Sequence, residues 1–393
     1  MIYDFDEIIE RKNTQSSKWD NVAARIGNGD ALPMWVADMD FRCPIQVVEA
    51  VKKRAEHEIY GYPYVPPEFY EVTASWLKKR HGWEIRSDWV VFTTGIVPVF
   101  NTMIQAFTEE GDEVIIQEPV YHQMIHPVKD NGRVISNNAL LCENGVYSID
   151  FEDLERRASK AEAKLLFLCS PHNPVGKVWS RQDLVRIAEI CLKYGVIIVS
   201  DEIHSDLLLF GNRHVPLASI DERYAWNSVS CFAPSKTFNI AGLRASGIVA
   251  PNPEIRKKLE NQFKKNKGIQ QNVFAVPAYI AAYTECDDYL EQLVAYLEKN
   301  IAFLAAFLEE RMPKIKIGKQ EATYLAWLNC KALNLSDEAL AEFFIDKSLV
   351  GVSLGTAFGD EGSGYVRLNI GCPRRTLEKA LHQILVQYKS FGF

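Results

Sequence analysis

One lysine in this sequence stands where a positive charge is costly. Lys236 lies inside VSCFAPSKTFNIAGLRASGIVA (229–250), a stretch that begins and ends with apolar residues typical of buried strands. A lysine in a partly desolvated site has a lowered pKa, and its neutral amine can form a Schiff base with an aldehyde. Ser235 beside it and Arg244 eight positions later can both bind a phosphate. The stretch therefore predicts a nucleophilic lysine next to a bound anion.

Further polar residues follow other apolar runs of the chain. Asp201 comes directly after GVIIVS (195–200), with His204 three positions on. Asn173 and Tyr121 follow two earlier runs. A buried carboxylate without a partner is costly, so Asp201 needs one. That partner is a base elsewhere in the chain, the N-terminus of a helix, or the protonated ring nitrogen of a cofactor.

A glycine turn adds a fifth element. Gly95 separates the apolar run WVVFTT (89–94) from a predicted helix with Pro98 in its first turn. Backbone N–H groups at such a turn suit a phosphate, although a plain strand-to-helix connection has the same pattern. Neither a dinucleotide fingerprint nor a P-loop motif occurs. A Schiff-base lysine, a carboxylate for a ring nitrogen, an aromatic side chain and a phosphate cup together predict a site for pyridoxal 5′-phosphate (PLP).

A sheet is expected to hold these residues. Apolar runs with little alternation recur from about residue 88, separated by predicted helices such as SRQDLVRIAEICLKYG (180–195), which is typical of a mostly parallel sheet covered on both faces. In such sheets ligands bind beyond the carboxyl ends of the strands, where the candidate residues stand. The predicted strands are WVVFTT (89–94), DEVIIQEP (112–119), AKLLFLCSP (163–171), GVIIVSDE (195–202), SVSCFAPS (228–235) and SGIVA (246–250).

The length of 393 residues predicts two domains, because single hydrophobic cores stop growing below that size. We expect an α/β fold with a large domain over residues 46–288 and a smaller α+β domain that combines 1–45 with 289–393. A long helix over 290–311 would leave the large domain, and strands over 322–330 and 365–371 would belong to the smaller one.

Composition and charge exclude several classes of function. A net charge of −7 argues against a nucleic-acid-binding protein, and no apolar run reaches the roughly 18 residues of a membrane span. The polar N-terminus has no signal-peptide pattern, so we expect a cytoplasmic protein. The eight cysteines form no C-x-x-C pair, which predicts reduced thiols and neither a metal site nor disulfides.

Four stretches resemble the fold-type-I PLP enzymes, the aspartate aminotransferase superfamily, in order and spacing over nearly the whole chain. They are SPHNPVGK (170–177), SDEIH (200–204), SKTFNIAGLR (235–244) and YVRLNIG (365–371). LPMWVADMDF (32–41), YGYP (60–63) and His204 are similar to the subgroup of carbon–sulfur β-lyases, the cystathionine β-lyases. The resemblance implies a large domain with a sheet of the seven-stranded type between layers of helices.

The resemblance also implies roles at a PLP site. Lys236 would hold the cofactor and later move a proton, Asp201 would pair with the ring nitrogen, and Tyr121 would stack on the ring. Asn173 would donate to the phenolic oxygen, and His204 can donate there too. The residues expected at the phosphate are Gly95, Ile96, Ser235 and Arg244.

Further residues are implied for the substrate and for a second subunit. Arg367 would bind the α-carboxylate of the substrate, and Trp35 and Tyr121 would contact the substrate as well. Tyr62, or else Tyr60, would reach the phosphate of the neighbouring subunit's cofactor. A homodimer is therefore the expected working unit.

Two positions depart from the family's usual pattern. Many aminotransferases have tyrosine where His204 stands, and an imidazole there makes the charge state depend on its surroundings. The family often has a serine three residues before the lysine, where this chain has Ala233. The phosphate cup would then have one hydroxyl group fewer.

The expected reaction is α,β-elimination. An amino acid with a thioether at Cβ, such as L-cystathionine, would lose its α-proton to Lys236 and then its sulfur, leaving a thiol such as homocysteine, pyruvate and ammonia. Two alternatives stay open at this point. An aminotransferase uses the same lysine, and a scaffold of this fold can carry an added regulatory binding role. The sequence does not specify which thioether is the substrate.

Overall fold

The structure, a computed structural model, describes residues 1–267 and 270–393. Its main sheet has seven strands in the order β2-β10-β9-β8-β7-β3-β4. All neighbours are parallel except those of β10, which is antiparallel to both β2 and β9. The predicted sheet, mostly parallel and of seven strands, is confirmed. In the order above, the strands are Val90–Thr93, Ser246–Val249, Ser228–Phe232, Ile197–Asp201, Ala163–Cys169, Glu113–Ile116 and Val134–Asn137.

Each of the six predicted runs contains one of these strands, but the apolar pattern misses β4. Its sequence is VISN, and only Ser136 in it is buried. β4 lies at the edge of the sheet and pairs with β3 alone. An edge strand that is partly exposed needs no continuous apolar run, so this strand left no clear signal.

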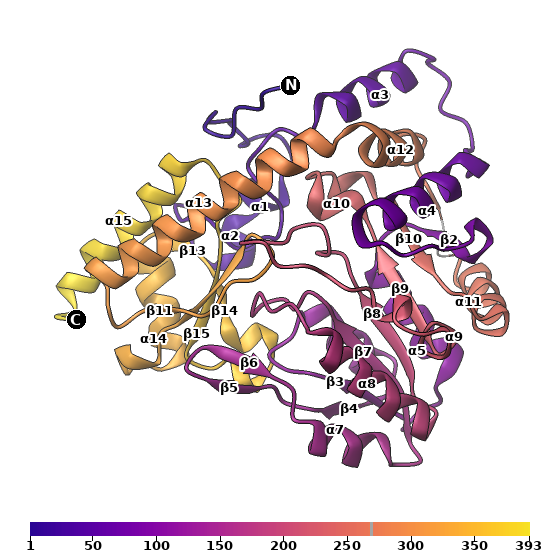
Figure 1. Ribbon diagram of the computed structural model, residues 1–393. Helices are drawn as coiled ribbons and strands as arrows, with labels where there is room; N and C mark the ends of the chain where they lie inside the picture. The colour runs from indigo at the N-terminus through magenta and orange to yellow at the C-terminus, as the bar shows by residue number, and fades with distance from the viewer. Residues whose placement is uncertain (268–269) are drawn as a thin grey trace.

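Helices cover both faces of the main sheet (Figure 1). Neighbouring residues of a strand point to opposite faces, so they pack against different helices. Val114 and Ile116 of β3 lie in one apolar cluster with α5 and α11. Ile115, between them, lies in another cluster with α7 and α8. The bounds of these helices are Val97–Phe107 for α5, Pro253–Lys265 for α11, Phe151–Ala158 for α7 and Arg181–Tyr194 for α8.

The ends of α8 lie where the sequence predicts them. The Ser180 side chain accepts a hydrogen bond from the Asp183 N–H, and the Asp183 side chain accepts one from the Ser180 N–H, which is a capping box. Gly195 ends the helix with a φ of +72°, a conformation that glycine adopts without strain.

A second sheet, of four strands in the order β11-β12-β15-β14, lies in the C-terminal part. The start of the chain joins this part, because β1 (Leu32–Pro33) pairs in parallel with β13 (Val350–Gly351). In Figure 1, α13 (Asp287–Arg311) runs as a long helix from beside the main sheet towards α15 (Arg374–Ser390). The domain boundaries near residues 45 and 288 stay a prediction. The strands of the second sheet, in the order given, are Lys316–Ile317, Leu325–Asn329, Tyr365–Asn369 and Ser353–Leu354.

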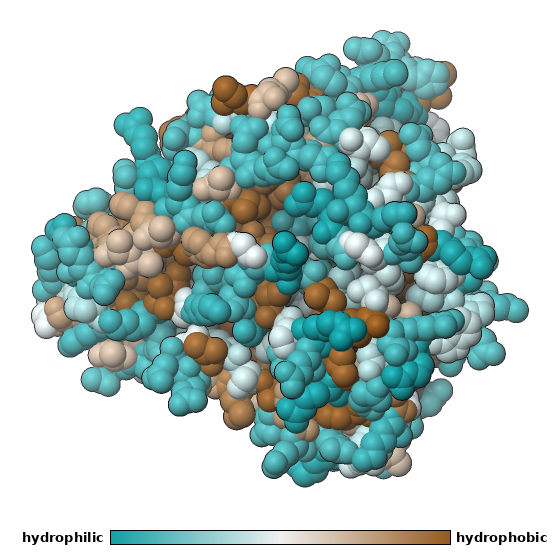
Figure 2. Space-filling model, in the orientation of Figure 1, coloured by the Kyte–Doolittle hydropathy of each residue, from teal (hydrophilic) through white to brown (hydrophobic). Residues whose placement is uncertain are grey.

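The face in Figure 2 is mostly hydrophilic, and apolar residues gather on its left side, where α13 and α15 lie. Within residues 1–267 and 270–393, no helix is both long and apolar enough to cross a membrane. All eight cysteines are free thiols. Further elements are α1 (Ser17–Asp20), α2 (Val22–Ile26), α3 (Ile45–Ala55), α4 (Pro67–His81), β5 (Leu141–Glu143), β6 (Val146–Ser148), α6 (His126–Asp130), α9 (Glu222–Trp226), α10 (Pro234–Thr237), α12 (Ala275–Glu285) and α14 (Asp337–Ala341).

Candidate active site

The main sheet brings the candidate residues together at the edge formed by the carboxyl ends of its parallel strands. Asp201 is the last residue of β8, and Lys236 lies in α10, four residues after β9. Because β10 is antiparallel to both of its neighbours, β2 and β9 end at the same edge. Arg244, two residues before β10, lies at that edge too. Chain direction alone therefore assembles most of the predicted site.

Lys236 is held by a backbone carbonyl. Its Nζ donates a hydrogen bond to the Ala37 oxygen at 2.7 Å. Burial lowers the pKa of Lys236 to about 8, while the nearby carboxylates of Asp38 and Asp201 oppose this shift and Arg367 adds to it. About a tenth of this amine is neutral at pH 7, far more than of an ordinary lysine, so Lys236 can act as a nucleophile and as a base.

Asp201 is buried at the carboxyl end of β8. The one hydrogen bond of its side chain to a described residue comes from the Ile203 N–H, which donates to Oδ1 at 3.2 Å. Burial raises the pKa of Asp201 to about 7, against the lowering effects of that hydrogen bond and of Lys236. Among the described residues, neither a helix N-terminus nor an ion pair therefore accounts for this carboxylate. A bound cation would stabilise its charged form.

His204 offers an unused hydrogen-bonding group at the same edge. The residue is buried, and its Nδ1 atom has no hydrogen-bond partner in the described part of the chain. Burial, together with the positive charges of Lys236 and Arg367, lowers the pKa of His204 to about 3, so the imidazole is neutral. A buried polar atom without a partner is costly, and a bound molecule would remove that cost.

Arg367 reaches the site from β15 of the second sheet. Its Nη1 donates to the Asn173 Oδ1 at 2.9 Å, and its Nη2 donates to the Trp35 oxygen at 2.9 Å. The guanidinium lies 4.7 Å from the centre of the Phe358 ring. Its Nε is buried without a partner among the described residues. Burial lowers the pKa of Arg367 to about 10, so the positive charge persists near neutral pH and suits a carboxylate.

Two tyrosines line the same region. Burial raises the pKa of Tyr121, with Arg367 opposing and Asp201 adding to the shift, so its phenol stays protonated. Tyr324 was not predicted as a site residue. Its hydroxyl donates to the Ala37 oxygen at 2.9 Å, the atom that also accepts from Lys236. A tyrosine within the apolar run 322–330 was a weak signal. Its partner lies 287 positions away, which no local pattern shows.

The predicted phosphate end is less complete. Gly95 has a φ of +132°, and its N–H donates to the buried Ser246 Oγ at 2.8 Å. The Gly95 amide, which we expected to bind a phosphate, is therefore already engaged. Of Gly95 and Ile96, only Ile96 stays a candidate for that role. Ser235 is half-buried, whereas Arg244 is exposed and bonds through its side chain to no described residue.

The two tyrosines proposed for a second subunit differ. Tyr62 is fully exposed. Tyr60 donates its hydroxyl hydrogen to the Ala55 oxygen at 2.8 Å, and its ring lies 5.8 Å from that of Phe274. Tyr60 is therefore engaged within its own chain, and Tyr62 is the better candidate for a contact with another copy.

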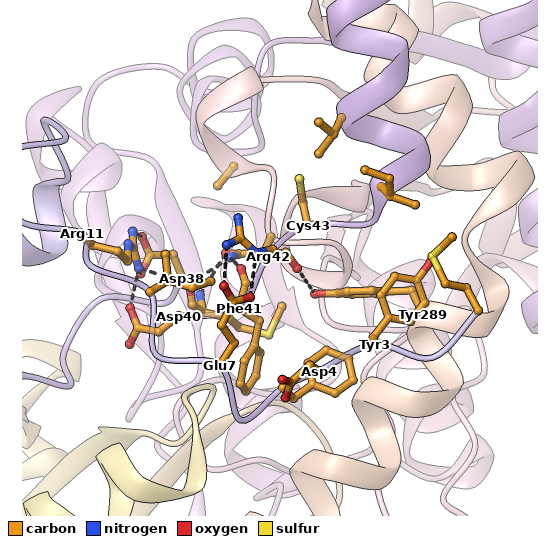
Figure 3. Close-up of a pocket in the computed structure, with 18 of the residues that line it drawn as sticks. Tyr3, Asp4, Glu7, Arg11, Asp38, Asp40, Phe41, Arg42, Cys43 and Tyr289 are labelled. Carbon is orange, nitrogen blue, oxygen red and sulfur yellow. Dashed lines mark hydrogen bonds and ion pairs between the residues drawn. The ribbon is translucent and has the colours of Figure 1, made fainter.

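A separate pocket of about 790 Å³ lies between the N-terminal segment, residues 38–43 and the loop that follows α10. Figure 3 shows Arg11 beside Asp38 and Asp40 at its wall, joined by ion pairs. Neither Lys236 nor Asp201 lines this pocket. It is therefore a neighbour of the candidate active site and not the site itself.

Comparison with known proteins decides the family. The family model described as aminotransferase class I and II matches residues 32–384. The chain belongs to the aminotransferase class I and II family. This confirms the fold-type-I resemblance that the motifs around Asn173, Asp201 and Lys236 suggested.

Relatives within the class I and II family are similar over nearly the whole chain. Cystathionine beta-lyase PatB of Bacillus subtilis (strain 168) is 46% identical over 380 residues, which are 97% of this chain and 98% of PatB. Protein MalY of Escherichia coli (strain K12) is 33% identical over 97% of both chains. The crystal structure of cystalysin from Treponema denticola, which contains PLP, matches with a TM-score of 0.96 and 37% identity, over 99% of this chain and 100% of cystalysin.

Proposed function

We propose that this chain is a PLP-dependent carbon–sulfur β-lyase. It cleaves L-cystathionine or related cysteine S-conjugates by α,β-elimination to a thiol, pyruvate and ammonia. The observation that carries the proposal is the convergence of Lys236, Asp201 and Arg367 at one sheet edge. The 46% identity to PatB, a cystathionine beta-lyase, favours elimination over amino-group transfer.

The residues at the sheet edge fit PLP. Lys236 provides an amine for the aldehyde, and the otherwise unpaired Asp201 provides a carboxylate for the ring nitrogen. The Asn173 Oδ1 accepts from Arg367, so the Asn173 Nδ2 is the group that can donate to the phenolic oxygen, and the unpartnered His204 Nδ1 is a second candidate. Tyr121 would stack on the ring. The residues assigned to the phosphate are Ile96, Ser235 and Arg244. Gly95 is assigned there as well, but its amide already donates to the Ser246 Oγ.

Bound PLP supplies an electron sink for the pair of electrons that remains when the substrate loses its α-proton. Within the chain, the Lys236 Nζ takes that proton. The Ala37 oxygen already accepts a hydrogen bond from this nitrogen, so it stabilises the ammonium as soon as the charge forms. His204 does not compete for the proton, because its pKa is about 3.

Arg367 orients the substrate by its α-carboxylate. The unpartnered Nε and the desolvated charge of its guanidinium favour an anion, and Phe358 holds the plane of the group. Trp35 accepts from the Nη2 atom through its backbone oxygen, and this bond limits how far the guanidinium can turn. We also propose a homodimer in which Tyr62 reaches the phosphate of the neighbouring subunit, since its side chain is fully exposed.

Release of pyruvate and thiol from L-cystathionine tests the proposal. We expect the two products in equal amounts without any added 2-oxo acid, and none from Lys236→Ala. Lys193→Ala removes a surface lysine that pairs with Glu155 and serves as the matched control with unchanged turnover. Borohydride should fix the cofactor to the peptide that contains Lys236. Turnover that requires a 2-oxo acid would instead make the protein an aminotransferase.

A further inference from the structure

Four buried titratable side chains lie behind the site and have no part in the proposed reaction. The His214 Nε2 and the Glu202 Oε2 are 2.7 Å apart, and the His81 Nε2 and the Asp206 Oδ1 are 3.2 Å apart. The two imidazole rings meet edge to face at 5.4 Å. All four side chains are at most 4% exposed. Buried pairs of this kind contribute little net stability, so the cluster calls for another role.

Asp206 makes the most contacts within this cluster. Its Oδ2 accepts a hydrogen bond from the Thr237 Oγ1 at 3.0 Å. Its two oxygens also accept from the Trp76 Nε1, at 3.2 and 3.3 Å. With His81, these bonds fix the carboxylate between α4 and α10. Asp206 therefore joins three segments of the chain, its own, the end of α4 and the helix that carries the lysine.

The helix that carries Lys236 depends on such contacts for its position. α10 has only four residues and no side-chain cap at its N-terminus, and a helix of that length is not stable by itself. Within the described part of the chain, its side chains make two hydrogen bonds, from Lys236 to the Ala37 oxygen and from Thr237 to Asp206. The first changes whenever the lysine nitrogen bonds to another atom. The second can persist throughout the reaction.

We propose that Asp206 is a positioning residue for Lys236, which it holds in place through Thr237. Asp206 lies five residues after Asp201, so the same short segment carries the partner of the ring nitrogen and the anchor of the lysine helix. The hydrogen bond from Thr237 to Asp206 therefore joins the lysine helix to the segment that carries Asp201. This inference rests on the proposed function.

The effect of Asp206 is one of position and not of charge. The charged groups that act on Lys236 are Asp38, Arg367 and Asp201, and Asp206 is not among them. Removing the hydrogen bond while keeping the carboxylate should therefore be enough to disturb the lysine. Thr237→Val does this, because valine has the shape of threonine without the hydroxyl group, and Thr237→Ser restores the hydroxyl.

The test compares PLP-loaded variants by the kcat and KM of pyruvate release and by the midpoint of the pH titration of their visible absorption band. In Thr237→Val we expect kcat to fall about 10- to 100-fold, since misplacement of a reacting group by about 1 Å has effects of that size. We also expect a shifted midpoint and a KM within about threefold of wild type. Thr237→Ser should behave like the wild type. Thr73→Val is the matched control, because Thr73 is equally buried and bonds to the Tyr279 hydroxyl at 2.9 Å.

A wild-type kcat and midpoint in Thr237→Val would overturn the proposal, as would an equal shift in Thr73→Val. If Thr237→Val does not fold, Thr237→Ala replaces it, because alanine also lacks the hydroxyl group that donates to Asp206. An unchanged midpoint in Thr237→Ala would then overturn the proposal. Absence of pyruvate release by the wild type would contradict the lyase function alone, since the midpoint of the absorption band still reports on Lys236.

Discussion

Glu118→Gln should remove one large contribution to the change in stability of this protein between pH 6 and pH 8, a contribution that lowers stability as pH rises. Glu118 follows β3, is 8% exposed, and lies beside Glu361. The Asn137 Nδ2 donates to both carboxylates, at 3.1 Å to Glu118 and 3.0 Å to Glu361. The Asp360 N–H also donates to Glu118, at 3.3 Å. Burial, and next the hydrogen bond and charge of Glu361, raise the pKa of Glu118 to about 8.

The sign and size of the effect follow from proton binding. The pKa of Glu118 is about 8 in the folded chain and 4.5 as the ordinary value, so between these values the folded chain holds a proton that the unfolded chain has lost. The contribution of Glu118 to the free energy of unfolding therefore falls as pH rises, by about 2 kcal/mol between pH 6 and pH 8. Glutamine cannot ionise, so Glu118→Gln should be the more stable protein at pH 8.

Urea unfolding at pH 6 and pH 8 measures this difference, at one protein concentration because association would add to stability. Glu361→Gln should remove only part of the difference, because burial, the largest cause of the raised pKa of Glu118, remains in that variant. Glu321→Gln is the matched control, because Glu321 is buried but pairs with Lys177 and Lys319, and its pKa is lowered overall. It should retain the wild-type difference. If Glu118→Gln retains that difference as well, Glu118 does not hold the proton at neutral pH.

Three further predictions concern Arg367 at the substrate carboxylate, Gly359, and the Ser180 cap of α8. Arg367→Lys should raise the KM for L-cystathionine about 10- to 100-fold, because an ammonium cannot replace the two-pronged guanidinium, and an unchanged KM would contradict the assigned role. Gly359→Ala should lower the free energy of unfolding by about 2–3 kcal/mol, since Gly359 has a φ of +111° and a Cβ atom there would overlap the Glu118 side chain; urea unfolding checks this. Ser180→Ala should cost about 1 kcal/mol of stability through the lost cap of α8, with kcat unchanged. A loss of kcat in that variant would show that α8 affects the site.

Several elements could be predicted because their signals are local. The ends of α8 are encoded within sixteen residues by Ser180, Asp183 and Gly195. The buried strands of the main sheet carry continuous apolar runs, since helices cover both of their faces. The edge strand β4 lacks such a run, and Tyr324 acts through a partner far along the chain, so neither could be recognised.

By itself, the sequence determined which side chains stand at the carboxyl ends of the strands. The carboxyl ends of parallel strands lie on the same side of the sheet, whatever the length of chain between the strands. The positions of Asp201 and Lys236 therefore followed from the apolar pattern of the strands and from their direction. Only the tertiary structure decided what these side chains contact. The acceptor of Lys236 lies 199 positions away, and the guanidinium of Arg367 meets Asn173 across 194 positions. Hydrogen bonds and pKa values depend on which distant segments pack together, and local periodicity carries no information about that packing.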